Sequence, residues 1–151
     1  MGAVGVASSL RRLLRAAGFI RVLAGEATTR ELGALGEKAA AAHLRGMGFS
    51  VLGRNVKVPM GEADLLCREG GMVVVVEVKT RLRREGAPEL SNLVAPEASV
   101  TARKRRKLFA IARHLKRANK WSRVRIDVVG VEYEATGGNP ILRHHPGIGW
   151  V

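Results

Sequence analysis

Apolar positions along this chain follow two periods. Short β-branched runs bounded by glycine or proline predict strands, and longer stretches with apolar residues every three or four positions predict helices. The predicted helices are Glu31 to Met47 and Ala102 to Ala118, and the predicted strands are Phe49 to Val58, Glu62 to Arg68, Met72 to Thr80, Arg123 to Glu132 and a last one near Ile141 to His144. This order predicts an α/β fold, with a mixed central sheet of about four or five strands flanked by one helix on each side. The strand after the second helix is expected to run parallel to a neighbour, because a helical crossover precedes it.

Gly70-Gly71 separates two of these strands and predicts an antiparallel hairpin, because a two-residue primed turn needs positive φ. Such a turn places Asp64 opposite Glu77 and Glu62 opposite Lys79. Opposite residues share a face, with Cβ atoms about 4.5–5.5 Å apart. The predicted register therefore brings two carboxylates together, with an ammonium two residues further along the same face. A slip of one residue would separate the carboxylates.

The chain has only two aspartates, Asp64 and Asp127, and both fall inside predicted strands. Strands disfavour aspartate, and an isolated buried carboxylate is costly, so their positions require a reason. Asp64 and Glu77 together offer acidic oxygens that suit a hard divalent cation such as Mg²⁺. Such a cation can activate water and neutralise a phosphoryl transition state. The alternative is that Asp64 and Glu62 form ordinary cross-strand ion pairs with basic neighbours.

Asp64, followed thirteen residues later by Glu77-Val78-Lys79, resembles the core motif of the PD-(D/E)XK nucleases. A longer series of blocks is more specific: LGALGEKAAAAHL (32–44), GRNVKVPMGEADLL (53–66), VVVVEVKTR (73–81), VTARKRRKL (100–108) and RIDVVGV (125–131). The residues of these blocks and their order resemble the bacterial YraN family, which is itself similar to archaeal Holliday-junction resolvases. The resemblance extends over about Gly33 to Val131, which is most of the chain.

The resemblance implies a restriction-endonuclease-like core and a metal-dependent endonuclease that acts on structured or branched DNA. By this resemblance Asp64, Glu77 and the Val78 carbonyl would hold Mg²⁺ or Mn²⁺, and Lys79 would orient or activate water. Glu37 matches a first-helix glutamate that belongs to the site in resolvase-like nucleases. The alternative for Glu37 is a first-turn acid that the helix dipole favours.

The formal net charge of +13 favours a polyanionic partner, most often nucleic acid. Between Thr101 and Arg125 the chain has eleven lysines and arginines and no acid. Like charges at helical spacing repel, and a bound phosphate backbone would relieve that repulsion. The residues expected to contact nucleic acid, with DNA as the expected partner, are Arg81, Arg103, Lys104, Arg106, Lys107 and Arg113. A charge run that is only a solvated face is the alternative.

The basic stretch 1–30 is predicted to be a disordered extension, and 31–151 to be a single nuclease-like domain. Leu82 to Ser99 is predicted to be a long loop. The single cysteine, Cys67, excludes an internal disulfide and indicates a reducing, cytoplasmic compartment. No apolar run approaches the length of a membrane span. The sequence leaves open whether the chain forms a homodimer.

Two other functions compete with the nuclease. One is a nucleic-acid-binding protein that keeps the fold but does not cleave. The other is an accessory protein at a ribosome or membrane surface that uses the basic N-terminal stretch. Asp127 is expected either to pair with an arginine or to support the site by contacting its residues rather than the metal. His144-His145 is expected to be an exposed polar pair rather than a metal site.

Overall fold

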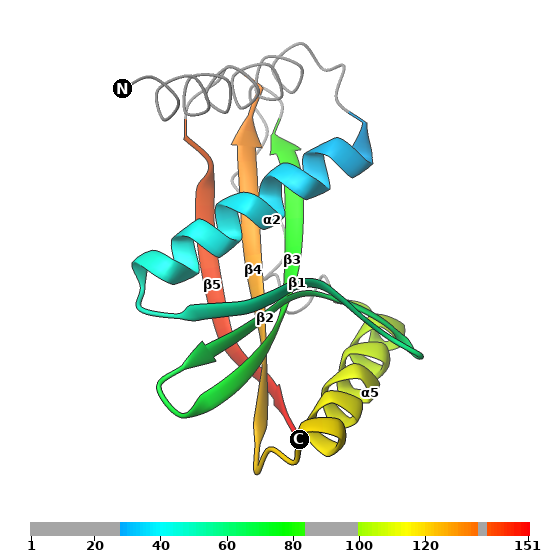
Figure 1. Ribbon diagram of the computed structural model, residues 1–151. Coiled ribbons are helices and arrows are strands. Elements are labelled where there is room, and N and C mark those ends of the chain that lie inside the picture. The colour runs from blue at the N-terminus through cyan, green and yellow to red at the C-terminus, as the bar shows by residue number, and fades with distance from the viewer. Residues whose placement is uncertain (1–27, 84–99, 136–138) are drawn as a thin grey trace, which may run out of the picture.

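The structure is a computed structural model that describes residues 28–83, 100–135 and 139–151. Its elements in chain order are α2 (Thr29–Gly46), β1 (Ser50–Val58), β2 (Gly61–Glu69), β3 (Met72–Arg83), α5 (Ala102–Asn119), β4 (Val124–Glu134) and β5 (Ile141–Trp150). The strands form one five-stranded sheet in the order β1-β2-β3-β4-β5. Figure 1 shows α2 crossing one face of this sheet, with α5 beside the β1–β2 hairpin. The predicted α/β fold is confirmed.

The sheet is mixed because α5 connects two parallel strands. β3 and β4 pair in parallel from Val73 with Val124 to Arg83 with Glu134, and the other neighbouring strands pair antiparallel. β3 and β4 are rich in valine because residues on both of their faces are buried. The parallel return after α5 is therefore also confirmed.

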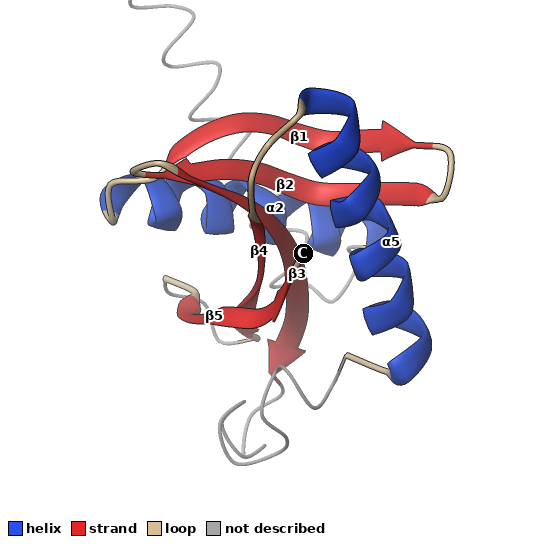
Figure 2. Ribbon diagram, turned by 90° about the horizontal axis from the view of Figure 1, so that it is seen from below, coloured by secondary structure: helices blue, strands red, loops and turns tan. Residues whose placement is uncertain are grey.

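Two hydrophobic cores lie on the two faces of the sheet. Val74 and Val76 point toward α2 and pack with Leu44, whereas Val73 and Val75 point toward α5 and pack with its buried apolar stripe. That stripe consists of Leu108, Ile111, Ala112 and Leu115. Figure 2 shows the two helices on opposite sides of β3. Neither of the two described helices is long and apolar enough to cross a membrane.

Helix α2 begins two residues before the predicted start. Thr28 caps it: the Thr28 hydroxyl accepts from the Glu31 N–H at 3.2 Å, and the Glu31 carboxylate accepts from the Thr28 N–H at 2.8 Å. This reciprocal pair is a capping box. Thr29 and Arg30 therefore belong to the helix rather than to the predicted extension, and the rest of that extension, up to residue 27, lies outside the described residues.

The hairpin register is confirmed from Glu69 opposite Met72 to Leu65 opposite Val76. Gly70, at the turn, has the positive φ (+55°) that a primed turn needs at its first central position. The ladder then ends, so the predicted pairs of Asp64 with Glu77 and of Glu62 with Lys79 are not part of it. Leu65 belongs to the core against α2, but Ala63 belongs to the core against α5, so β2 twists between them and leaves β3.

Strands β3 and β5 extend furthest beyond their predicted ends. β3 continues through Leu82 and Arg83 because it stays paired with β4, and Arg83 bonds to Glu134. The predicted loop thus loses its first two residues, and 84–99 lie outside the described residues. β5 continues to Trp150, past an exposed Pro146, which is tolerated because β5 is an edge strand.

Candidate functional site

Asp64 lies on β2 at the point where this strand leaves β3. Beyond the last ladder pair, its side chain takes the place of a backbone partner: Oδ2 accepts a 2.7 Å hydrogen bond from the Val78 N–H. The carboxylate thereby satisfies a backbone donor that would otherwise need another acceptor. This bond holds Asp64 beside the segment of β3 that contains Glu77 and Lys79.

Glu77 lies on β3 and is only 2% exposed. Its Oε1 lies 3.1 Å from the Lys79 Nζ and 3.0 Å from the Lys104 Nζ. Its Oε2 is buried and has no hydrogen-bond partner in the part of the chain that the structure describes. Buried polar atoms are nearly always bonded, so Glu77 Oε2 retains an unused capacity to bind a ligand.

The Glu77 carboxylate acts on Asp64. The pKa of Asp64 is raised from 3.8 to about 7, first because burial disfavours its charged form and next because the Glu77 carboxylate lies near it. The Val78 N–H and the Lys104 ammonium act in the opposite direction, and Glu37 adds a smaller upward effect. Asp64 and Glu77 therefore share one partly buried site, as the register predicted, although they are not a ladder pair.

Glu37 reaches this site from α2. Gly36 lets the helix approach β3 closely, because a Cβ at this position would overlap the Thr80 side chain. The Asn55 amide, on β1, donates a 3.0 Å hydrogen bond to Glu37 Oε2. Glu37 is thus fixed between a helix and the hairpin rather than left as a solvated first-turn acid.

The acids that raise the pKa of Glu37 come from the same region as Asp64 and Glu77. Burial raises its pKa most, the Arg54 guanidinium lowers it, and the Glu62 and Glu77 carboxylates raise it further. Four acids from three elements, Glu37 on α2, Glu62 and Asp64 on β2, and Glu77 on β3, therefore act on one region. This concentration of negative charge stands out in a chain whose net charge is +13.

The donor set for a metal is small. Within residues 28–83, 100–135 and 139–151, no group of three or more histidine, cysteine, aspartate or glutamate side chains could hold a metal ion. Asp64 and Glu77 supply two carboxylates, and the family resemblance adds the Val78 carbonyl as the expected third protein donor. Mg²⁺ is commonly held by one or two carboxylates, with water completing its shell.

Lys79 and Arg81 follow Glu77 on the same face of β3. The Lys79 side chain is 34% exposed, so its ammonium is accessible to solvent while it contacts Glu77. Arg81 is exposed, one step further along the strand. A molecule that reached Glu77 from this side would meet both cations.

Lys104 is placed differently from its predicted role. The charge run predicts it as a nucleic-acid contact, but its ammonium contacts the buried Glu77. Helical spacing could have revealed this, because Lys104 precedes Leu108 by four residues and Ile111 by seven, and both of these are buried against the sheet. The hydrogen bond from Asn55 to Glu37 had no comparable signal, because the two residues are eighteen positions apart and lie on different elements.

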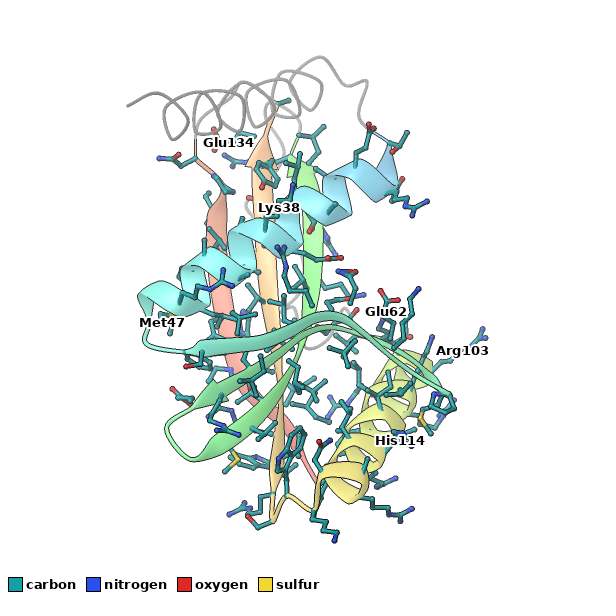
Figure 3. All side chains as sticks on the ribbon, in the orientation of Figure 1. Lys38, Met47, Glu62, Arg103, His114 and Glu134 are labelled. Atoms are coloured by element: carbon teal, nitrogen blue, oxygen red, sulfur yellow. The ribbon has the colours of Figure 1, made fainter. Side chains whose placement is uncertain are left out.

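The remaining basic residues predicted on α5 lie outside the carboxylate cluster. Arg103, Arg106, Lys107 and Arg113 are exposed. A groove of about 550 Å³ runs along this surface, lined by Ala102, Arg105, Arg106, Phe109 and Arg113. The Lys107 side chain lies against Gly61 in the β1–β2 turn, so this hairpin and α5 meet. In Figure 3, Glu62 on the hairpin and Arg103 on α5 both point outward.

Asp127 forms a second cluster that is separate from the site. It is fully buried and accepts hydrogen bonds from Arg125 (2.7 and 2.8 Å), from His144 Nε2 (2.8 Å) and from the Gly147 N–H (2.9 Å). Burial opposes ionisation, but these bonds together lower the pKa of Asp127. The β4–β5 register shifts at this position, so Asp127 stabilises a β-bulge.

The contacts of Asp127 bear on two predictions from the sequence, one for His144 and one for Asp127 itself. The His144 side chain is only 8% exposed, so the prediction of an exposed histidine pair is wrong for this residue. Asp127 pairs with an arginine, which was one of its two expected roles. It lies opposite Val76 in the ladder and therefore on the α2 face, whereas Glu77 lies on the α5 face. The hydrogen-bond partners of Asp127 are Arg125, His144 and Gly147, and none of them belongs to the candidate site.

Comparisons with known proteins agree with the sequence blocks. The chain is 34% identical over 123 residues to UPF0102 protein DSY2577 of Desulfitobacterium hafniense strain Y51, covering 80% of this chain and 92% of that protein. It is 39% identical over 124 residues to a UPF0102 protein of Mycolicibacterium smegmatis, covering 81% and 95%. The model of "Uncharacterised protein family UPF0102" matches residues 36–131, a range that contains Glu37, Asp64, Glu77, Lys79 and Lys104. The chain therefore belongs to the UPF0102 family, which is the YraN family whose blocks it resembles.

Proposed function

We propose that this protein is a divalent-metal-dependent endonuclease that hydrolyses phosphodiester bonds in structured or branched DNA. The observation that carries the proposal is the convergence of Asp64, Glu77 and Lys79 where β2 leaves β3, with Glu77 Oε2 buried and without a hydrogen-bond partner among the described residues. The preference for branched DNA rests on the resemblance to resolvases. The description of the UPF0102 family states no activity, so it does not bear on the proposal.

The residues of the site fit a hard divalent cation. Glu77 Oε2 lacks a partner among the described residues, and Asp64 has a raised pKa because it is buried beside a second carboxylate. A cation bound by both carboxylates would give Glu77 Oε2 a partner and would favour the ionised form of Asp64. We therefore assign Asp64 and Glu77, with the Val78 carbonyl, as the ligands of Mg²⁺ or Mn²⁺. When bound, such an ion supplies Lewis acidity toward a phosphoryl oxygen and lowers the pKa of water.

The other residues of the site have separate roles in this proposal. The Lys79 ammonium, accessible to solvent and anchored on Glu77, orients the attacking water or stabilises the charge that develops on the phosphoryl group. Glu37, held by Asn55, accepts a hydrogen bond from water at the α2 side of the site. The Val78 N–H keeps Asp64 in place.

The α5 surface would hold the DNA. Phosphates pair well with arginines because the planar guanidinium donates two parallel hydrogen bonds. Arg106 and Arg113 line the groove, and Arg103 and Lys107 lie exposed on the same helix. Lys104, in the first turn of this helix, contacts Glu77, so a backbone lying along α5 would reach the carboxylate site.

Binding without cleavage is the second candidate, and one observation favours it. Both lysines near Glu77 pair with the same oxygen, so the protein itself neutralises much of the charge that would attract a metal. A protein that retained the fold only to bind nucleic acid could keep Glu77 paired with both lysines.

Cleavage assays separate the two candidates. Wild type is incubated with branched, single-stranded and duplex DNA and with Mg²⁺ or Mn²⁺, alongside Lys79→Ala and Lys38→Ala. Lys38 is an exposed lysine on α2, so its variant removes the same group away from the site (Figure 3). The nuclease proposal expects cleavage by wild type and Lys38→Ala, and none by Lys79→Ala. Tight binding of branched DNA without cleavage by wild type would favour the second candidate, and equal cleavage by Lys79→Ala would contradict the assigned site.

A further inference from the structure

Lys104 occupies a position that is unfavourable for a lysine on its own. It is the third residue of α5, and its backbone N–H bonds to the capping Thr101 hydroxyl at 3.2 Å. The positive end of the helix dipole lies in this first turn, which favours acids, yet α5 has no acid there. The Lys104 ammonium is stabilised instead by Glu77, 3.0 Å away on β3.

Of the two side chains in the Lys104–Glu77 ion pair, Lys104 is the one that can move. The Lys104 side chain is 32% exposed, whereas that of Glu77 is 3% exposed. The lysine can therefore rotate into solvent without unpacking the core, while the carboxylate stays in place. Lys79 contacts the same Glu77 oxygen at 3.1 Å, so Glu77 keeps one cation when Lys104 withdraws.

We propose that Lys104 is a resident counter-ion of Glu77 that a divalent metal displaces, and that the displaced ammonium then binds a DNA phosphate beside the site. The inference rests on the proposed function. The Lys104 charge also acts on Asp64, so a metal held by Asp64 and Glu77 would lie near a like charge. That repulsion strengthens as the distance shortens in a partly buried site, and it is relieved when the lysine rotates outward.

The displaced lysine would couple metal binding to DNA binding. Lys104 shares its helix with the exposed Arg103 and Lys107, so its ammonium moves toward the surface that would hold the phosphates. Metal would then raise DNA affinity in two ways, through its own charge and through release of Lys104. Each ligand raises the affinity of the other, because coupling between two sites is reciprocal.

The first test is Mn²⁺ binding by isothermal titration calorimetry, without DNA and without turnover. The variants are Lys104→Met, Lys104→Arg and the matched control Lys107→Met, which removes one charge from the same helix at a residue that lies against Gly61. Lys104→Met is expected to bind Mn²⁺ more tightly than wild type, on the order of tenfold. Lys104→Arg, which keeps the charge, and Lys107→Met should remain near wild type. Thermal melting establishes that each variant is folded, and Lys104→Gln replaces Lys104→Met if the latter is not.

Weaker or unchanged Mn²⁺ binding by folded Lys104→Met would overturn the inference and leave the proposed nuclease intact. An equal gain in Lys107→Met would also overturn it, because the effect would then be one of net charge. Absence of Mn²⁺ binding in all variants would overturn both the inference and the metal-dependent function.

The second test measures the coupling. In a Lys79→Ala background, which is expected to bind metal without cutting, duplex DNA affinity is measured with and without Mn²⁺. Adding Lys104→Met should reduce the gain in DNA affinity that Mn²⁺ produces. The same gain with and without Lys104 would contradict its release to the phosphate.

Discussion

The Asp64 carboxylate accepts a 2.7 Å hydrogen bond from the backbone N–H of Val78. This bond joins two strands where their ladder has ended, so Asp64 remains beside Glu77 although β2 has already left β3. The same geometry buries Asp64 next to a second acid and raises its pKa to about 7. The proposed cation would offset this cost, because it would favour the charged form of Asp64.

The raised pKa of Asp64 predicts that the metal-free protein loses stability as the pH rises. The folded protein holds this proton up to about pH 7, whereas an unfolded chain releases it near pH 4. The stabilisation from this group is therefore complete below about pH 4 and is lost as the pH rises to about 7. Urea unfolding of wild type and Asp64→Asn at pH 5 and pH 8, with chelator, measures it. Wild type should lose more stability across this range than Asp64→Asn, and equal losses would contradict the raised pKa.

The close approach of α2 to β3 predicts opposite effects for two glycine substitutions. Gly36→Ala should destabilise the protein by about 1–3 kcal/mol, because the new Cβ would overlap Thr80. Gly33→Ala is the matched control on the same helix: its Cβ would have no neighbour within 4 Å, so it should stabilise by about 0.5–1 kcal/mol. Urea unfolding measures both. A neutral Gly36→Ala would show that α2, and with it Glu37, is not held by this contact.

The alternation of apolar residues and the Gly70 turn were enough to predict the fold and the register near the turn. The pattern could not predict where β2 leaves β3, because that depends on Ala63 packing against α5, which is distant in sequence. The burial of His144 was missed for a similar reason, since its partner Asp127 is seventeen residues away, across a β-bulge. Lys104, in contrast, could have been assigned to the inner face from its spacing to Leu108.

Asp127 is predicted to contribute to stability rather than to metal binding. Asp127→Asn removes the charge that pairs with Arg125 and weakens the bonds from His144 and the Gly147 N–H. Loss of a charged partner in a buried pair costs about 3–5 kcal/mol. The unfolding free energy should fall by about this amount, while Mn²⁺ affinity of the folded variant stays at the wild-type value. A selective loss of Mn²⁺ affinity with normal stability would place Asp127 in the site after all.

The exposed cations of α5 are predicted to bind phosphates. Changing Arg103, Arg106, Lys107 and Arg113 to Gln should weaken binding to any duplex, because phosphate recognition carries no sequence information. The slope of log affinity against log salt should fall by about 0.9 for each B-DNA phosphate that the variant no longer neutralises. A control with the same reduction of charge changes Arg30, Lys38, Arg45 and Arg68, which are exposed on α2 and β2. The same fall in slope for both variants would mean that net charge, not the α5 surface, binds DNA.

The central claim is that Asp64 and Glu77 together hold a divalent cation. Anomalous diffraction from crystals soaked in Mn²⁺ tests it most directly, because it locates the ion without requiring activity. We expect one peak within coordination distance of the Asp64 carboxylate and of Glu77 Oε2, and no such peak in Asp64→Asn crystals soaked in the same way. A peak elsewhere, or no peak while the Glu77 carboxylate remains paired with its lysines, would contradict the claim.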